Sequence, residues 1–329
     1  MTIDDIAALL YEANGELVSG EEMASKLGIT RAAVWKHIEE LKSLGYDVIS
    51  KPRHGYAMAK EADLLLPCAV KNGLKTAYMG QNYLFHAAID STNNEAKKLA
   101  RAGVAEGTVV LAEEQGAGRG RLSRAFFSPK GKGLWFSVIL RPPFLPQEAP
   151  KCTLMAAAAV ARAMEDINLT PGIKWPNDII HEGKKVTGIL TEMSAEMDSI
   201  NYVVIGIGIN VNIWPEDFPA ELREIATSLT VMGGKKISRV AFLQRVLKHL
   251  ENLYEDAKKR GFAPIIEEWR RHSVTLGQNV QVLGVGQNES FSGYATDIDE
   301  TGALLVDTGS EVRRVLAGDV SIRSKKCGE

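Results

Sequence analysis

The chain has 329 residues, of which 45% are hydrophobic and 24% charged, fractions that exclude an intrinsically disordered protein. Its length predicts two or three domains, and its formal charge of −2 shows no overall basic excess. The cysteines Cys68, Cys152 and Cys327 are isolated, which excludes a disulfide framework and argues against zinc fingers. No apolar run reaches the roughly 18 residues of a membrane span, and the N-terminus is acidic, so we expect a cytoplasmic chain without a membrane partner.

The first sixty residues are polarised in charge. Residues 1–25 contain no Lys or Arg, whereas residues 26–60 contain seven basic and three acidic side chains. Helices are expected over residues 3–13 and 19–27, where Ser19 and Glu22 form a capping-box pattern, and over a third segment capped by Thr30 and ended by Gly45. Strands are expected over residues 46–50 and 56–59.

These elements predict a winged helix–turn–helix DNA-binding domain over residues 1–62. Its helix–turn–helix covers about Gly20 to Glu39, and charge on one face suits contact with phosphates. The expected contacts with DNA are Thr30, Arg31, Ala32, Trp35 and Lys36, with Lys51 and Arg53 on the wing. A small protein-interaction module with a solvated basic face is the alternative.

Farther along, the periodicity breaks up over residues 63–82, where we expect a linker. Residues 83–272 predict an α/β domain with a mixed sheet. Its strands are expected over residues 83–89, 108–114, 134–140, 173–181, 185–194 and 202–213, and its longer helices over residues 147–167, 239–260 and 264–272. Short strands punctuated by glycine then predict a small β-barrel over residues 273–329.

The segment from Gln115 to Arg124 holds three glycines and three arginines in ten positions. Glycine lets the backbone approach a ligand closely, and arginine binds phosphate or carboxylate oxygens with two parallel hydrogen bonds. The segment therefore suits an anionic ligand. It matches neither a dinucleotide fingerprint nor a phosphate-binding Walker motif. A surface segment that contacts RNA is the alternative.

Two further segments add polar and small residues between apolar strands. Residues 174–178 read Lys-Trp-Pro-Asn-Asp, and Lys185 follows at the start of the next strand, where it could place a point charge in a pocket. An exposed hairpin lysine is the alternative reading. Residues 206–210 alternate glycine with apolar residues, which would leave room for a flat ring beside the sheet. Simple packing of the sheet against a helix is the alternative interpretation.

Taken in this order, the motifs resemble those of the bifunctional biotin–protein ligases that also repress the biotin operon. The matching residues are 30–38, 91–93, 115 with 118–121, 174–178, 185 and 206–210. The resemblance implies a catalytic domain on the fold of class II aminoacyl-tRNA synthetases and an SH3-like C-terminal domain. The chain departs from the family at Phe126, where tryptophan is frequent, and this difference concerns how the closed loop packs.

The resemblance also implies a biotin–[acetyl-CoA-carboxylase] ligase reaction. Biotin and ATP, with Mg²⁺, would give biotinyl-5′-AMP, and an acceptor lysine of a biotin carboxyl carrier domain would then attack it. Arg121 and Lys185 would be catalytic, and Asn177 and Asn210 would contact ATP. The biotin and adenylate site would comprise Ser91, Thr92, Asn93, Gln115, Gly118, Arg119, Gly120, Arg121, Lys185, Gly206 and Gly208.

Regulation follows from the same resemblance. The chain would bind operator DNA of biotin genes as a homodimer promoted by its ligand, and no resident metal site is expected. The alternatives are a lipoate-type protein ligase, a ligase whose N-terminal module binds only protein, and a biotin-sensing repressor that never transfers biotin.

Overall fold

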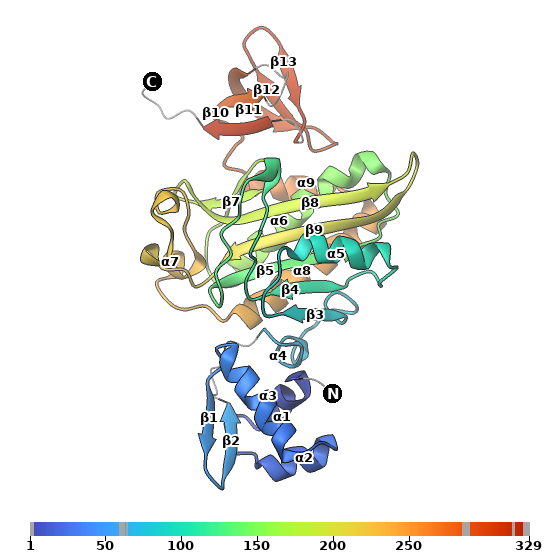
Figure 1. The fold of residues 1–329 in the computed structure, drawn as a ribbon. Helices are drawn as coiled ribbons and strands as arrows, with labels where there is room; N and C mark the ends of the chain where they lie inside the picture. The colour runs from blue at the N-terminus through green and yellow to red at the C-terminus, as the bar shows by residue number, and fades with distance from the viewer. Residues whose placement is uncertain (1–2, 59–62, 64, 285–289, 318–319, 325–329) are drawn as a thin grey trace.

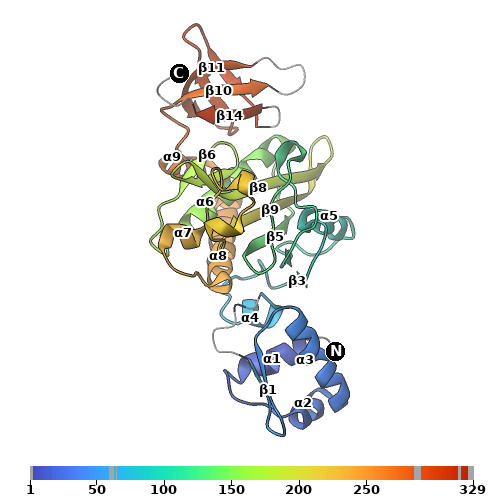
Figure 2. The same cartoon turned by 60° about the vertical axis from the view of Figure 1, so that its left-hand side comes forward.

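The structure is a computed structural model that describes residues 3–58, 63, 65–284, 290–317 and 320–324. It consists of three parts in a row: a small helical module, a central sheet covered by helices, and a small β-domain at the opposite end (Figure 1). The view turned by 60° keeps the same order (Figure 2). Cys327 and residues 59–62, where the predicted domain boundary falls, lie outside the described residues.

The N-terminal module has the elements of a winged helix–turn–helix. It contains α1 (Ile3–Glu12), α2 (Gly20–Leu27), α3 (Arg31–Ser43) and the antiparallel strands β1 (Val48–Lys51) and β2 (Gly55–Met58). The predicted caps are confirmed, because Ser19 Oγ accepts from Glu22 N–H at 3.0 Å and Thr30 Oγ1 accepts from Ala33 N–H at 3.2 Å. Apolar residues of the three helices form one buried core: Ile6, Leu10, Met23, Val34, Ile38 and Leu41.

The segment expected as a linker is packed and contains a helix, α4 (Pro67–Lys71). Leu66 and Ala69 belong to the core of the N-terminal module, whereas Leu65 and Val70 belong to the core of the central domain. Neighbouring side chains of this segment therefore point into two different cores. Pro67 begins the helix at a position where its missing N–H costs no hydrogen bond.

The central sheet is mixed, as predicted. Its seven strands lie in the order β3-β4-β5-β9-β8-β7-β6, and the pairing is antiparallel except between β3 and β4. Their bounds are β3 (Tyr83–His86), β4 (Val109–Ala112), β5 (Gly133–Leu140), β6 (Gly172–Lys174), β7 (Asp178–His181), β8 (Lys184–Ala195) and β9 (Ile200–Asn210).

Helices cover both faces of this sheet (Figure 1). On one face α5 (Thr92–Arg101) packs Ala96 and Ala100 against Val110 and Ile139. On the other face lie α6 (Ala149–Glu165), α8 (Arg239–Arg260) and α9 (Ala263–His272), while the short α7 (Leu229–Gly233) follows β9 in the chain. Helices α6 and α8 pack against alternate residues of the strands, such as Val109 and Leu111. The site described below opens on the α5 face.

The single strand expected over residues 173–181 is wrong. Residues 175–177 form a turn that separates β6 from β7, and the two strands pair antiparallel with each other. Pro176 has no N–H to give to a strand ladder, which is the physical reason for the break. Trp175 is buried at this turn, and its indole N–H donates to the Gly302 carbonyl of the C-terminal domain at 3.1 Å.

The C-terminal domain is a small antiparallel β-domain, as predicted. Its strands lie in the order β13-β12-β11-β10-β14. They are β10 (Asn279–Gly284), β11 (Phe291–Ile298), β12 (Leu304–Asp307), β13 (Val312–Val315) and β14 (Val320–Ser324), of which the last was not identified in the sequence. Within the described residues, no helix is both long and apolar enough to cross a bilayer.

Candidate active site and nucleic-acid interface

Two adjoining cavities lie on the α5 face of the sheet. Gly120, Phe126, Asn177 and Lys185 line both of them. The first is also lined by Ser91, Thr92, Asn93, Gln115, Arg119, Phe136, Gly188, Ile189, Leu190, Gly206, Ile207 and Gly208. Most residues that the sequence predicts for biotin thus meet in one cavity, although they come from separate parts of the chain.

A chain of hydrogen bonds runs between polar side chains of the first cavity. Gln115 Oε1 accepts from the backbone N–H of Thr92 at 2.8 Å and from its hydroxyl at 3.1 Å. Ser137 Oγ lies 2.6 Å from Asn93 Oδ1 and 2.8 Å from Thr92 Oγ1. Because an amide oxygen can only accept, the single Ser137 hydrogen goes to Asn93. The single Thr92 hydrogen is then shared between Gln115 and Ser137, and the Thr92 oxygen can accept from an N–H group of a ligand.

The Asn93 amide is fixed from the other side. Its Nδ2 donates to the Leu190 carbonyl at 3.2 Å and to the Glu192 carboxylate at 2.8 Å. Lys97 pairs with the other oxygen of Glu192 at 2.6 Å. No sequence pattern indicates Glu192, because it lies 99 positions from Asn93 and reaches it only through the sheet.

Glycines on the two central strands make room for these side chains. A Cβ on Gly206 would lie 2.1 Å from Asn93 Oδ1, and one on Gly208 would lie 2.5 Å from the Phe126 ring. Gly188, on β8, likewise has the Phe126 ring and the Lys185 side chain at 2.9 Å from where a Cβ would stand. The spacing of glycines thus leaves a flat surface on which an aromatic ring lies.

Residues 114–132, which lie between Glu113 and the start of β5, are called the ligand loop below. Arg119 and Gly120 line the first cavity, whereas Arg121 lines only the second. Gly118 lines neither. It is buried where the loop turns back on itself, and a Cβ there would lie 2.7 Å from the Phe126 carbonyl oxygen. Its role is therefore close backbone packing.

Arg121 ties the ligand loop to two other parts of the molecule. Its guanidinium donates to Asn177 Oδ1 at 3.2 Å and to the Ala317 carbonyl of the C-terminal domain. Burial lowers the pKa of Arg121, and the nearby Asp178 carboxylate opposes this shift. A partly desolvated cation of this kind interacts more strongly with an anion than one in bulk water.

Lys185 lies on the border between the two cavities. Its Nζ is 2.7 Å from Asp178 Oδ1 and 5.6 Å from the centre of the Phe126 ring, and a third of its side chain is exposed. Phe126 packs edge-on against Trp135, with ring centres 5.8 Å apart. The Lys185 ammonium can therefore face ligands in both cavities while one carboxylate holds it in place.

The two asparagines predicted for ATP are both buried. Asn177 donates to the Ile189 carbonyl at 2.9 Å, and Asn210 donates to the Thr227 carbonyl at 3.0 Å. Asn177 lines both cavities, whereas Asn210 lines only the second. The side-chain N–H groups of both asparagines bind backbone carbonyls. The two residues therefore position the cavity walls as well as forming part of them.

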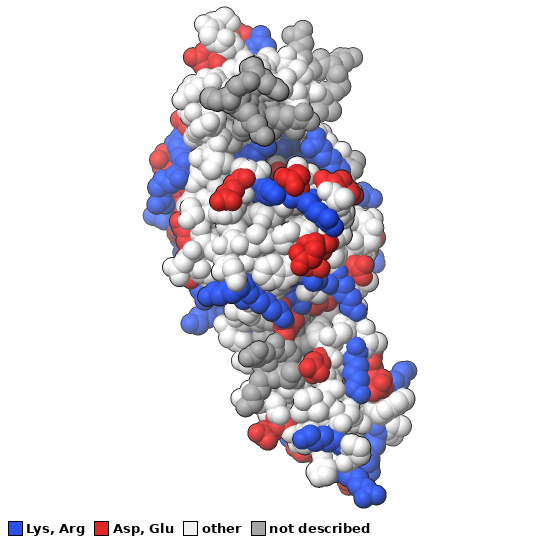
Figure 3. All heavy atoms as spheres, turned by 90° about the vertical axis from the view of Figure 1, so that its left-hand side faces the viewer, with Lys and Arg blue, Asp and Glu red and all other residues white. Residues whose placement is uncertain are grey.

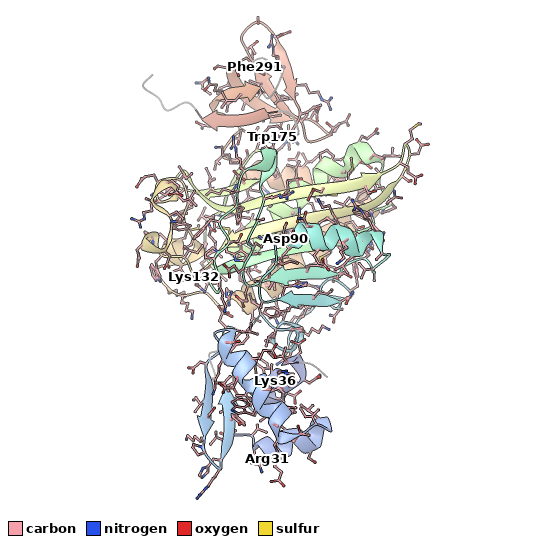
Figure 4. The ribbon with its side chains drawn as sticks, in the orientation of Figure 1. Arg31, Lys36, Asp90, Lys132, Trp175 and Phe291 are labelled. Carbon is pink, nitrogen blue, oxygen red and sulfur yellow. The ribbon has the colours of Figure 1, made fainter. Side chains whose placement is uncertain are left out.

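The predicted DNA contacts lie on the N-terminal module, at the far end of the molecule from Trp175 (Figure 4). Arg31, Ala32 and Lys36 are exposed on α3, and Trp35 is 57% exposed, which is unusual for a tryptophan and leaves its ring free for a partner. Lys and Arg side chains gather at the lower tip of this module (Figure 3). Lys51 and Arg53 are exposed on the wing, whereas Thr30 is occupied as the cap of α3.

Family models match all three parts of the chain. Residues 85–210 match the biotin/lipoate A/B protein ligase family, residues 2–57 match the HTH domain, and residues 275–323 match the biotin protein ligase C-terminal domain.

Relatives extend over the whole chain. The bifunctional ligase/repressor BirA of Bacillus subtilis (strain 168) is 43% identical over 97% of this chain and 98% of its own length. The protein of the same name from Escherichia coli (strain K12) is 30% identical over 95% of each chain. Among solved structures, the biotin protein ligase from Aquifex aeolicus in complex with biotin and ATP is 31% identical. It superposes with a TM-score of 0.66 and covers 74% of this chain and 100% of its own.

Proposed function

The chain belongs to the bifunctional ligase/repressor family of biotin–protein ligases, and we propose that its two adjoining cavities hold biotin and ATP side by side. It is a biotin–[acetyl-CoA-carboxylase] ligase with an N-terminal helix–turn–helix domain for repression. The observation that carries the site assignment is that Lys185, Asn177, Gly120 and Phe126 line both cavities. Two substrates bound there would meet at that border.

The first cavity fits the ring system of biotin. Its polar wall around Thr92 and Gln115 presents hydrogen-bond acceptors and few charges, which suits the two N–H groups of a cyclic urea. The biotin carboxylate would then point to the border, where Arg119 and Lys185 supply positive charge.

In the first step, an oxygen of the biotin carboxylate attacks the α-phosphorus of ATP, and pyrophosphate leaves. Two anions must approach each other, so Lys185 and Arg121 offset their repulsion and stabilise the charge that develops at phosphorus. In the second step, the amine of the acceptor lysine attacks the acyl carbon, and AMP leaves. The acceptor protein supplies this nucleophile, so the site needs only to orient the adenylate.

Mg²⁺ would enter with ATP. The described residues contain no group of three or more His, Cys, Asp or Glu side chains that could hold a metal ion by themselves. Asp178 and Asn177 offer oxygen atoms in the second cavity, which fits an ion that keeps most of its ligands from phosphate and water. Bound there, the ion would neutralise phosphate charge.

We expect Arg121→Gly to release the adenylate before transfer. The substitution removes the contacts of the ligand loop with Asn177 and Ala317, and a hydrogen bond from a charged group contributes about 1.5–3 kcal/mol. Escape of biotinyl-adenylate should therefore rise by roughly tenfold or more, which is measured as free adenylate and as labelling of lysines on unrelated proteins. Lys130→Gly, on an exposed cation of the same loop that lines neither cavity, is the control. Equal retention by the Arg121 variant and the parent would refute this role.

A lipoate ligase is the alternative that the shared family name leaves open. Incubating the protein with ATP and an acceptor domain, with biotin in one reaction and lipoate in another, distinguishes the two. We expect the acceptor lysine to be modified by biotin only, and only when ATP is present. Transfer of lipoate, or binding of biotin without transfer, would support the other readings.

The repressor function is assigned to the exposed faces of α3 and the wing. One small module has little surface for tight specific binding, whereas a two-fold dimer reads two half-sites on one duplex. We propose that the adenylate orders the ligand loop and so favours a homodimer that binds operator DNA.

Biotin with ATP should then control both the oligomeric state of the protein and its affinity for operator DNA. We expect biotin with ATP to raise the dimer fraction in sedimentation and to tighten operator binding, and linkage requires the dimer to bind adenylate more tightly by the same factor. Salt is kept fixed because phosphate contacts make affinity salt-dependent. A mass distribution and an operator affinity that both ignore the ligand would contradict the proposal.

A further inference from the structure

One buried arginine joins the two ends of the ligand loop. Arg239 is the first residue of α8, lines neither cavity, and has a side chain that is only 4% exposed. Its Nη1 donates to Glu113 Oε2 at 2.7 Å and to the Gly133 carbonyl at 3.2 Å. Glu113 precedes the ligand loop and Gly133 follows it, so a single guanidinium spans the base of the loop.

The same guanidinium binds the segment that leads from the N-terminal module. Its Nε donates to Asp63 Oδ2 at 2.7 Å, its Nη2 donates to the Asp63 carbonyl at 2.9 Å, and the backbone N–H of Arg239 donates to Asp63 Oδ1 at 3.0 Å. Its Nη2 also donates to Glu113 Oε1 at 3.3 Å. All five N–H groups of the side chain are therefore used.

The charges of this cluster are unequal. One guanidinium faces two carboxylates, and the Glu113 and Asp63 side chains are only 4% and 15% exposed. Burial disfavours the Arg239 charge, but the two carboxylates outweigh it and raise the pKa of the guanidinium above its ordinary value. Removing either carboxylate leaves one buried pair of opposite charges, whereas removing the arginine leaves two buried negative charges.

We propose that Arg239 is a positioning residue for adenylate formation and retention. It fixes the ends of the ligand loop through Glu113 and Gly133, while its bonds to Asp63 anchor only the connection to the N-terminal module. Gln115, which orients Thr92, lies two positions after Glu113 in the segment that follows β4. A shift at Glu113 would therefore move the wall of the first cavity. The inference rests on the proposed function, because it assigns a role in that site.

Two matched variants of the full chain test the proposal. Glu113→Gln and Asp63→Asn each change a buried carboxylate of the same cluster to an amide. Each variant keeps the Arg239 guanidinium paired with the one remaining carboxylate. We expect Glu113→Gln to raise the KM for biotin and the rate of adenylate loss about tenfold, since small displacements near reacting groups cost large factors in rate. We expect Asp63→Asn to stay within about twofold of the parent in both, at a similar melting temperature.

Several outcomes would overturn the proposal: equal effects of the two variants, an effect of Asp63→Asn alone, or parental behaviour of Glu113→Gln. Should Glu113→Gln fail to fold, Arg239→Lys carries the same test, because it keeps the charge but not the planar fork. That variant should lose adenylate at least tenfold faster, and parental retention would refute the role. A parent that forms no adenylate in this assay would instead refute the proposed function.

Discussion

Replacing Lys185 by alanine should lower the rate of adenylate formation roughly 100- to 1,000-fold, the range found when one preorganised charge-stabilising group is removed. Its ammonium lies on the border of the two cavities and is held by Asp178 at 2.7 Å. The contacts that we propose for the biotin ring, around Thr92, do not involve Lys185, so biotin binding should weaken much less than the rate. Release of pyrophosphate in a single turnover measures the chemical step directly.

The neighbouring lysine provides a matched control. Lys184 carries the same charge at the start of the same strand, but its ammonium donates to the Arg223 carbonyl at 2.9 Å, and it lines neither cavity. Lys184→Ala should therefore leave the rate near that of the parent. Similar rates of adenylate formation for Lys184→Ala and Lys185→Ala would contradict the role assigned to Lys185.

Deleting residues 1–62 should abolish operator binding and leave a core that still ligates biotin. The exposed basic residues of α3 and the wing are all removed, whereas none of the described residues that line the two cavities lies before Ser91. A gel-shift assay of operator binding and an assay of acceptor biotinylation, made on the same preparation, test the two parts of this prediction. Arg31→Ala with Lys36→Ala in the full chain is the milder control, and it should weaken DNA binding alone.

The structure adds a condition to this prediction. Phe85 and Val240 of the central domain pack against the core of the N-terminal module, so the deletion exposes apolar surface. The truncated chain should be somewhat less stable. If it retained its circular dichroism but lost ligation, the module would have to help build the active site.

Local features of the fold could be predicted from the sequence because their causes are local. The caps Ser19 and Thr30 lie three positions from the N–H groups that they accept, and Gly45 follows α3 with a left-handed φ of 90°. Residues 173–181 show the limit, since their apolar content favoured one strand although Pro176 lies at the turn between two.

The arrangement of the candidate site could be predicted only in part. The glycine and arginine pattern of residues 115–124 indicated an anion-binding loop, and most of its predicted partners line the same cavity. Contacts between distant positions left no pattern in the sequence. Arg121 reaches Ala317 across 196 positions, and Arg239 reaches Glu113 across 126. Such pairs depend on tertiary packing, which no short motif encodes.

Trapping the intermediate shows whether the two cavities join biotin to ATP. The full chain is incubated with biotin and ATP labelled in its α-phosphate, passed over a desalting column, and then mixed with a biotin carboxyl carrier domain. We expect labelled biotinyl-5′-AMP to elute with the protein, and expect the acceptor to release the label as AMP while its lysine becomes biotinylated. Label that does not elute with the protein, or that stays bound while the acceptor remains unmodified, would contradict a site in which one pair of cavities joins biotin to ATP and hands it on.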